Sequence, residues 1–183
     1  MHRVGGQLVV VHDDPAGPLK PTLQDVLALL RQSEVLLMAE CKAIPRSYPG
    51  LLPAVVAALR EFDRIDRSYL LSFDHPLVRE AKRAEPRLRT CALSSIRLHE
   101  PGPYVRSLGA DACALSRDAV GLRSATGDLE SHPLESCRAA GIPLWIYTVN
   151  EPSEMDRLIG AGISGIFTDY PDRLSRRLPR RLA

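Results

Sequence analysis

The chain has 183 residues, of which 45% are hydrophobic and 25% are charged, and its formal net charge at pH 7 is +2. These values are those of one globular domain with a sizeable core, and they exclude a general attraction to nucleic acid. No apolar run approaches the roughly 18–20 residues of a transmembrane helix, and residues 1–14 lack the layout of a signal peptide. We therefore expect a single domain over residues 1–183 that ends in a basic tail over 173–183. We expect no membrane span and no nucleic-acid partner, and the sequence leaves the oligomeric state open.

The cysteines show neither a CxxC pair nor the spacing of a zinc site; they are Cys41, Cys91, Cys113 and Cys137. The first three lie inside apolar, strand-like runs, which is typical of cysteines that act as buried small hydrophobic residues. Reduced cysteines fit the cytoplasm better than an oxidising compartment. We therefore predict a cytoplasmic location.

Strands and helices alternate along the chain. A strand over residues 8–12 ends in His12 and Asp13, and a helix over 22–32 begins at Thr22, a plausible N-cap. Further strands are predicted over 35–42, 69–73, 90–94, 111–115, 144–149 and 165–168, and further helices over 50–62, 76–85, 104–108, 129–140 and 152–161.

The alternation of apolar strands with amphipathic helices indicates an α/β fold with a parallel sheet covered by helices. Two architectures remain open on this pattern: an open doubly wound sheet and a (β/α)₈ barrel. The sequence lacks the GxxxxGK[ST] of a phosphate-binding P-loop. Polar residues follow nearly every strand, and this favours the barrel, whose sites lie at the carboxyl ends of the strands.

The strand over 35–42 ends in Glu40 and Lys42, which point to the same face because they are two positions apart. A carboxylate can hold a metal, an ammonium can hold an anion, and the nearby His12 can move a proton. Together these groups suit metal-assisted chemistry on a phosphate. The alternatives are a surface ion pair between Glu40 and Lys42 and a structural His12. Trp145, the only tryptophan, can serve either core packing or substrate contact.

Several motifs resemble the glycerophosphodiester phosphodiesterase family, in order and spacing, from about Gly5 to Arg173. They are LVVVHDD (8–14), the Glu40-Cys41-Lys42 strand end, LLSFD (70–74) and WIYTVNEPSEMDRLIGAGISGIFTDYPD (145–172). The resemblance implies a TIM barrel with a divalent metal, Ca or Mg. It also implies hydrolysis of a small-molecule glycerophosphodiester to glycerol 3-phosphate and an alcohol, within lipid metabolism.

The resemblance also implies roles for individual residues. His12 matches a catalytic acid/base, and Glu40 matches a carboxylate ligand of the metal. Lys42 matches a lysine near the phosphate, while Phe73 and Trp145 match apolar contacts near the glycerol. We expect His12, Glu40, Lys42 and Trp145 to converge at the carboxyl ends of the strands.

Two family motifs do not precede His12 in this sequence: His-Arg-Gly, and Glu-x-Asp, which supplies two further metal carboxylates. The segment His2-Arg3-Val4 does not substitute for the first of them. We therefore expect an incomplete TIM-type barrel that lacks the first strand-helix unit and most of the second strand. We also expect impaired metal binding and little activity in the isolated chain. Three hypotheses follow: a recorded start that is too late, a non-catalytic truncated barrel that binds a phosphate-containing ligand or partner, and a gene remnant.

Overall fold

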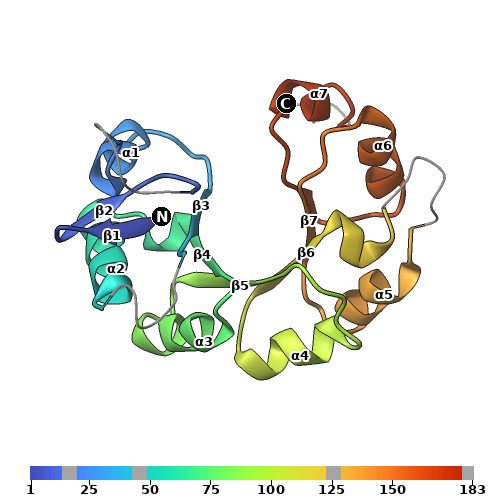
Figure 1. Cartoon of the computed structure of the whole chain (residues 1–183), viewed down its shortest axis with the longest axis horizontal. Helices are drawn as coiled ribbons and strands as arrows, with labels where there is room; N and C mark the ends of the chain where they lie inside the picture. The colour runs from blue at the N-terminus through green and yellow to red at the C-terminus, as the bar shows by residue number, and fades with distance from the viewer. Residues whose placement is uncertain (14–19, 43–48, 123–128, 179–183) are drawn as a thin grey trace. The chain divides into compact units, whose positions relative to one another are not determined.

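The computed structural model describes residues 1–13, 20–42, 49–122 and 129–178 (Figure 1). They fall into two compact units, Met1–Ala92 with Leu108–Ala110 and Leu93–Ser107 with Asp111–Ala183. The main sheet has the strand order β3-β4-β5-β6-β7-β8, so each strand lies beside its predecessor in the chain. This order is that of a (β/α) barrel, because a doubly wound sheet reverses direction at a switch point. The predicted incomplete TIM-type barrel is confirmed. None of the helices within the described ranges has the length and apolar character needed to cross a membrane.

The first unit begins with a hairpin that sequence analysis did not predict. β1 (His2–Val4) pairs antiparallel with β2 (Gln7–Val9), and His2 lies opposite Val9. Gly5 and Gly6 connect them with φ of 54° and 86°, the positive values that a two-residue type I′ turn requires. The predicted strand over 8–12 is therefore wrong in its bounds. Its first two residues belong to strand β2 of the hairpin, and residues 10–12 are not part of a strand.

The remaining elements of the first unit agree with the predicted alternation. They are α1 (Leu23–Leu29), β3 (Leu37–Glu40), α2 (Leu51–Glu61), β4 (Ser68–Ser72), α3 (His75–Ala84) and β5 (Arg89–Ser94). β3, β4 and β5 pair in parallel. The predicted N-cap of α1 is confirmed as a capping box, in which Thr22 and Asp25 each bond the other's backbone N–H.

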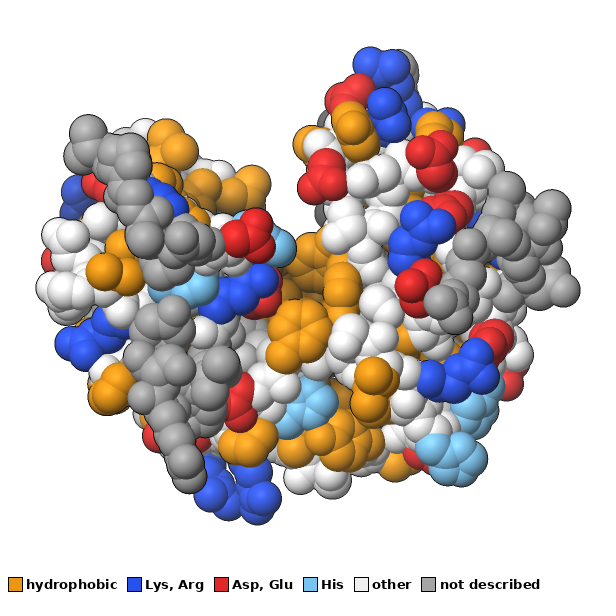
Figure 2. Space-filling model, in the orientation of Figure 1, with side chains coloured by type: hydrophobic (Ala, Val, Ile, Leu, Met, Phe, Trp, Pro, Cys, Tyr) orange, Lys and Arg blue, Asp and Glu red, His pale blue; other side chains and the backbone are white. Residues whose placement is uncertain are grey.

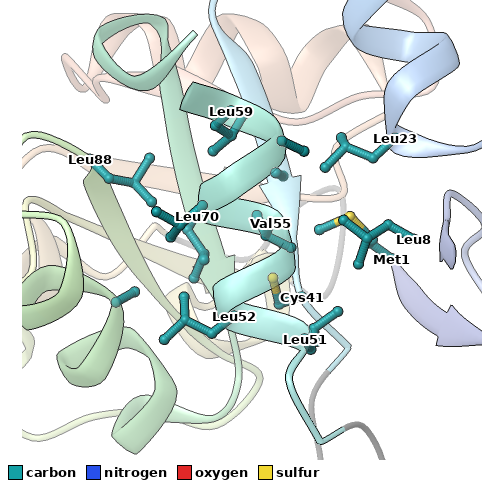
Figure 3. Packing of buried hydrophobic residues seen from close by; sticks show 14 of the residues in the cluster. Met1, Leu8, Leu23, Cys41, Leu51, Leu52, Val55, Leu59, Leu70 and Leu88 are labelled. Carbon is teal, nitrogen blue, oxygen red and sulfur yellow. The ribbon is translucent and has the colours of Figure 1, made fainter. Parts of the chain in front are cut away.

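The core of the first unit lies between α2 and the strands (Figure 3). α2 presents a buried apolar face, including Val55 and Leu59, toward Leu70 of β4. Leu8 of β2 and Met1 join the same cluster, so the hairpin is packed onto the barrel elements. Burial of a side chain such as Leu8, which is 2% exposed, is worth roughly 1.5–3 kcal/mol.

A buried arginine fixes the segment that enters β3. Arg64 is 2% exposed, and its guanidinium donates to the backbone carbonyls of Leu30, Ser33 and Val35. These carbonyls lie in the connection between α1 and β3. The clamp therefore sets the path of the chain into β3 and, with it, the direction of the residues at the strand's end.

The second unit repeats the strand-helix pattern. Its elements are α4 (Pro101–Leu108), β6 (Ala112–Ser116), α5 (Ser131–Ala139), β7 (Leu144–Tyr147), α6 (Pro152–Gly160), β8 (Gly165–Ile166) and α7 (Pro171–Ser175). β6, β7 and β8 pair in parallel. Glu154 of α6 is 3% exposed and pairs with Arg117 at 2.6 Å, which ties α6 to the segment after β6. The predicted burial of the cysteines is confirmed for all four, which are free in the structure.

The predicted basic tail is only partly within the described residues. Arg173 lies in α7, with its guanidinium 3.7 Å from the ring centroid of Tyr170. Arg176 and Arg177 pair with Asp172 and Asp156. The remaining part of the predicted tail, 179–183, lies outside the described residues.

Candidate functional site

Glu40 and Lys42 meet at the carboxyl end of β3. The Lys42 Nζ lies 3.0 Å from the Glu40 Oε1, and the side chains are 24% and 28% exposed, respectively. Their placement two residues apart on a strand's end puts both on one face, as the sequence predicts. The pair is therefore half-buried at a strand terminus, which distinguishes it from a fully exposed surface ion pair.

Backbone groups of Met1 form hydrogen bonds with the same strand end. The amino-terminal ammonium donates to the carbonyl of Glu40 at 2.9 Å, and the Lys42 N–H donates to the carbonyl of Met1 at 3.1 Å. Burial is the main cause that lowers the pKa of this ammonium. These two bonds connect the start of the hairpin to the edge of β3.

A pocket of about 210 Å³ opens beside this strand end, in the first unit. Glu40, Lys42 and His12 line it together with apolar residues that include Leu23 of α1 and Met38 of β3. Histidine, acidic and basic side chains gather on the surface of the first unit near the end of β3 (Figure 2). The structure thus brings together three of the residues that sequence analysis singled out, while their roles stay predictions.

His12 stands at the rim of the pocket. Its side chain is 79% exposed, and its Nδ1 lies 2.6 Å from the Oδ1 of Asp13. A carboxylate beside Nδ1 orients the ring and favours the tautomer that carries the proton on Nδ1. The Nε2 atom is then the one suited to take up or release a proton.

Sequence analysis missed His2, whose side chain contacts the backbone of His12, a residue of the pocket lining. His2 is 7% exposed, and burial is the largest cause that lowers its pKa; the amino-terminal ammonium, Lys42 and Lys20 lower it further, while a hydrogen bond to the His12 backbone raises it. The Gly5-Gly6 turn was the local signal for the hairpin that buries His2.

The residues that follow Lys20 pair with the residues that follow the hairpin. Val9 forms an antiparallel bridge with Thr22, and the Val10 N–H donates to the carbonyl of Pro21 at 2.8 Å. This pairing brings the segment after Lys20 against the segment that leads to His12. This pairing cannot be predicted from a periodic pattern in the sequence.

The described residues do not by themselves fit a divalent metal. Glu40 is the carboxylate among the described residues that line the pocket, and Lys42 pairs with it at 3.0 Å. Within the described ranges, no group of three His, Cys, Asp or Glu side chains is placed to hold a metal ion. A hard cation such as Ca²⁺ takes about 6–8 oxygen ligands, so one paired carboxylate is too few.

The two predicted apolar contacts differ in exposure. Phe73 follows β4 in the first unit and is 48% exposed. Trp145 lies in β7 of the second unit, is 8% exposed, and packs edge-on against Phe167 with ring centroids 6.0 Å apart. Gly165 leaves room for this ring, since a Cβ there would lie 2.7 Å from the Trp145 Cδ1. Most of the Trp145 side chain is therefore buried by packing, which was one of its two predicted roles. Its contact with a substrate stays a prediction.

Hydrogen bonds join the ends of β7 and β8 in the second unit. The Asn150 Oδ1 accepts from the Thr168 hydroxyl at 3.1 Å and from the Asp169 N–H at 3.0 Å. The Asn150 Nδ2 donates to the Asp169 carboxylate at 2.8 Å. One amide thereby fixes the loop that leads into α7.

Comparisons with known proteins agree on one family. A model of the glycerophosphoryl diester phosphodiesterase family matches residues 11–173. A glycerophosphodiester phosphodiesterase from Caldanaerobacter subterraneus subsp. tengcongensis is 30% identical over 159 residues, which are 87% of this chain and 62% of that protein.

Solved structures show the same fold. A Silicibacter pomeroyi protein assigned as a glycerophosphoryl diester phosphodiesterase gives a TM-score of 0.74 at 25% identity, over 86% of this chain and 56% of that one. An Oleispira antarctica phosphodiesterase, in complex with the product sn-glycerol-3-phosphate, gives a TM-score of 0.70 at 18% identity, over 86% and 61%. The chain spans less than two thirds of the length of each of these relatives.

Proposed function

This chain belongs to the glycerophosphoryl diester phosphodiesterase family, and we propose that it forms part of a barrel that hydrolyses glycerophosphodiesters to sn-glycerol 3-phosphate and an alcohol. The observation that carries the proposal is the pocket at the end of β3, where His12, Glu40 and Lys42 meet. An imidazole, a carboxylate and an ammonium at one strand end are the groups that phosphodiester hydrolysis uses.

His12 is the residue we assign to proton transfer. Asp13 binds its Nδ1, so Nε2 is the atom that exchanges a proton with the substrate. Lys42 offsets the charge that gathers on the phosphate oxygens, in a site screened from water on one side by Leu23 and Met38. Hydrolysis needs one group to take a proton from the nucleophile and another to give one to the leaving alcohol. His12 can act as the base or as the acid, but not as both in the same step.

A divalent metal, Ca or Mg, belongs to the proposal only for a barrel that carries the additional Glu-x-Asp carboxylates. Glu40 would be one ligand among them, and the cation would supply Lewis-acid polarisation of the phosphate. We further propose that Phe73 and Trp145 contact the glycerol. The proposed compartment is the cytoplasm, because the four cysteines are free and buried rather than paired in disulfides.

The test compares the isolated chain with a chain preceded by the corresponding amino-terminal segment of the Caldanaerobacter relative. Release of sn-glycerol 3-phosphate from glycerophosphocholine is measured with Ca²⁺ or Mg²⁺ and with EDTA. Losing members of a catalytic unit costs on the order of 10³–10⁶ in rate, so the isolated chain should show little turnover. The completed chain should be active, metal-dependent, and inactivated by His12→Ala and by Glu40→Ala.

His132→Ala is the matched control, because His132 is an exposed histidine of the second unit whose Nε2 lies 2.6 Å from the carbonyl of His99. It should leave the activity of the completed chain unchanged. Turnover by the isolated chain at about 1 per second or faster, an ordinary rate for an enzyme, would contradict the assignment. So would a completed enzyme that is indifferent to both His12→Ala and Glu40→Ala.

A further inference from the structure

A groove of about 450 Å³ lies in the second unit, between the neighbouring helices α4 and α5 (Figure 1). Its lining includes the small or apolar residues Pro103, Ala139 and Ala140. Glu100 and Arg106 line the same groove and carry opposite charges. Sites for small ligands commonly combine an apolar lining with a few polar groups that fix the orientation of the ligand, and this groove has that composition.

The carboxylate of Glu100 is positioned by Ser136 of α5. The Ser136 hydroxyl donates to the Glu100 Oε2 at 2.8 Å and accepts from the Gly102 N–H at 3.2 Å. The Glu100 Oε1 lies 3.7 Å from the His132 Nε2, which donates to the carbonyl of His99 at 2.6 Å. Within the described part of the chain, Glu100 therefore has no lysine or arginine that neutralises it.

Arg106 is bound one helical turn further along α5. Its Nη2 donates to the carbonyl of Ala140, the C-cap residue of α5, and the other donors of the guanidinium remain for a ligand. Ser136 and Ala140 are four residues apart, so the groups that hold the two charged side chains differ by about 6 Å along the helix. Among residues 1–13, 20–42, 49–122 and 129–178, Arg106 forms no ion pair with a carboxylate, Glu100 included.

We propose that this groove binds a small zwitterion, with a primary ammonium at Glu100 and a carboxylate at Arg106. One molecule that meets both charges forms two charge-assisted contacts, while the groove offers a lone anion or a lone cation only one. The guanidinium fork matches a carboxylate, and a single arginine matches its single charge better than the double charge of a phosphate. The site lies away from the strand end at β3, so this inference is independent of the proposed hydrolysis.

The composition and spacing of the groove narrow the ligand further. The described residues that line it include no aromatic ring of the kind that favours a quaternary ammonium, whereas a primary ammonium can donate to Glu100. The separation of the two charges favours a ligand whose charged ends are several bonds apart. An ω-amino acid such as γ-aminobutyrate should therefore bind more tightly than glycine.

The experiment is NMR titration of the isotope-labelled full chain at pH 7, with γ-aminobutyrate, glycine, butyrate and butylamine as separate probes. We expect γ-aminobutyrate to bind with a dissociation constant on the order of 1 mM, as suits a small ligand with few contacts, and to shift backbone resonances of α4 and α5. Glycine has its charges closer together, and butyrate and butylamine each have one charge. All three should bind several-fold more weakly.

Substitutions separate the roles of the two charges. Glu100→Gln and Arg106→Gln should each weaken γ-aminobutyrate binding about 10-fold, the size of a hydrogen bond to a charged group. Glu100→Gln should leave butyrate binding unchanged, and Arg106→Gln should leave butylamine binding unchanged, whereas general damage to the groove would weaken both. Glu130→Gln and Arg97→Gln are the matched controls, because they break the ion pair between Arg97 and Glu130 outside the groove lining. Both should bind like the unaltered chain.

Three results would overturn the inference. They are the absence of saturation by γ-aminobutyrate at about 10 times the expected dissociation constant, resonance shifts that lie outside α4 and α5, and equal weakening by the control variants. Thermal melts establish that each variant is folded. If Arg106→Gln fails to fold because the carbonyl of Ala140 loses its donor, Glu100→Gln decides alone, through its different effects on γ-aminobutyrate and butyrate.

Discussion

The strand ends of the two units carry different kinds of polar contact. At the end of β3, the contacts are between charged groups: Lys42 with Glu40, and the exposed His12 with Asp13 beside it. At the ends of β7 and β8, a neutral amide, Asn150, closes a set of hydrogen bonds to the next strand's loop. The charged groups at the end of β3 are partly exposed, so a charged ligand can interact with them. The donors and acceptors of Asn150 are instead bonded to the loop after β8.

The difference suggests a division between ligand binding and support. Charged groups at a partly exposed site contribute little to stability, so they are free to serve a ligand. Satisfied hydrogen bonds between loops contribute mainly to rigidity. Substitutions in the first unit's strand end should therefore change binding, and those in the second should change stability.

Trp145→Ala should have the largest effect on stability. The ring is 8% exposed and packs against Phe167, so its loss leaves a cavity in the second unit. Large-to-small changes of this kind cost about 3–5 kcal/mol, which chemical denaturation can measure.

Phe73→Ala is the control from the first unit. Its side chain is 48% exposed, and a change at such a surface position should stay within about 0.5 kcal/mol. Equal losses of stability in the two variants would remove the contrast between the units.

Gly165→Ala should have an intermediate effect, through the same ring. A Cβ at Gly165 would lie 2.7 Å from the Trp145 Cδ1, so the ring or the strand must move. Overpacking of this kind costs about 1–3 kcal/mol. Gly160→Ala provides the matched control, because a Cβ at Gly160 in α6 meets nothing within 4 Å. A melting temperature that falls for both variants would show that the backbone, rather than the contact with Trp145, resists substitution.

Local chemistry made much of the fold predictable. Thr22 and Asp25 predicted the start of α1, and they form the expected capping box. Apolar runs marked β4 and β5 to within one residue at each end, because strands buried on both faces read as continuous apolar sequence. His12, Glu40 and Lys42 were identified because strand ends in a barrel point to one rim.

The hairpin and the residues it brings to the site were not predicted. The apolar run LVVV masked a three-residue strand, although Gly5-Gly6 is a strong local turn signal. The pairing of Val9 with Thr22 joins two segments that no periodicity in the sequence connects. Such contacts follow from tertiary register, which a pattern read along one segment does not contain.

A small effect on stability is expected for Glu40→Gln, and its counterpart in the second unit is Asn150→Ala. Glu40 loses an ion pair whose members are both partly exposed, so Lys42 can turn to water and the free energy of unfolding should change by less than about 1 kcal/mol. Asn150 loses three hydrogen bonds to Thr168 and Asp169, and at about 0.5–1.5 kcal/mol for each bond the cost should be clearly larger. Denaturant midpoints of the two variants, measured side by side in low and high salt, test this order. Only the Glu40→Gln difference should shrink with salt, because screening weakens an ion pair more than a neutral hydrogen bond.

A larger loss of stability for Glu40→Gln than for Asn150→Ala would contradict the contrast between the two units. It would mean that the ion pair at the end of β3 stabilises the fold and does not serve mainly to bind a ligand.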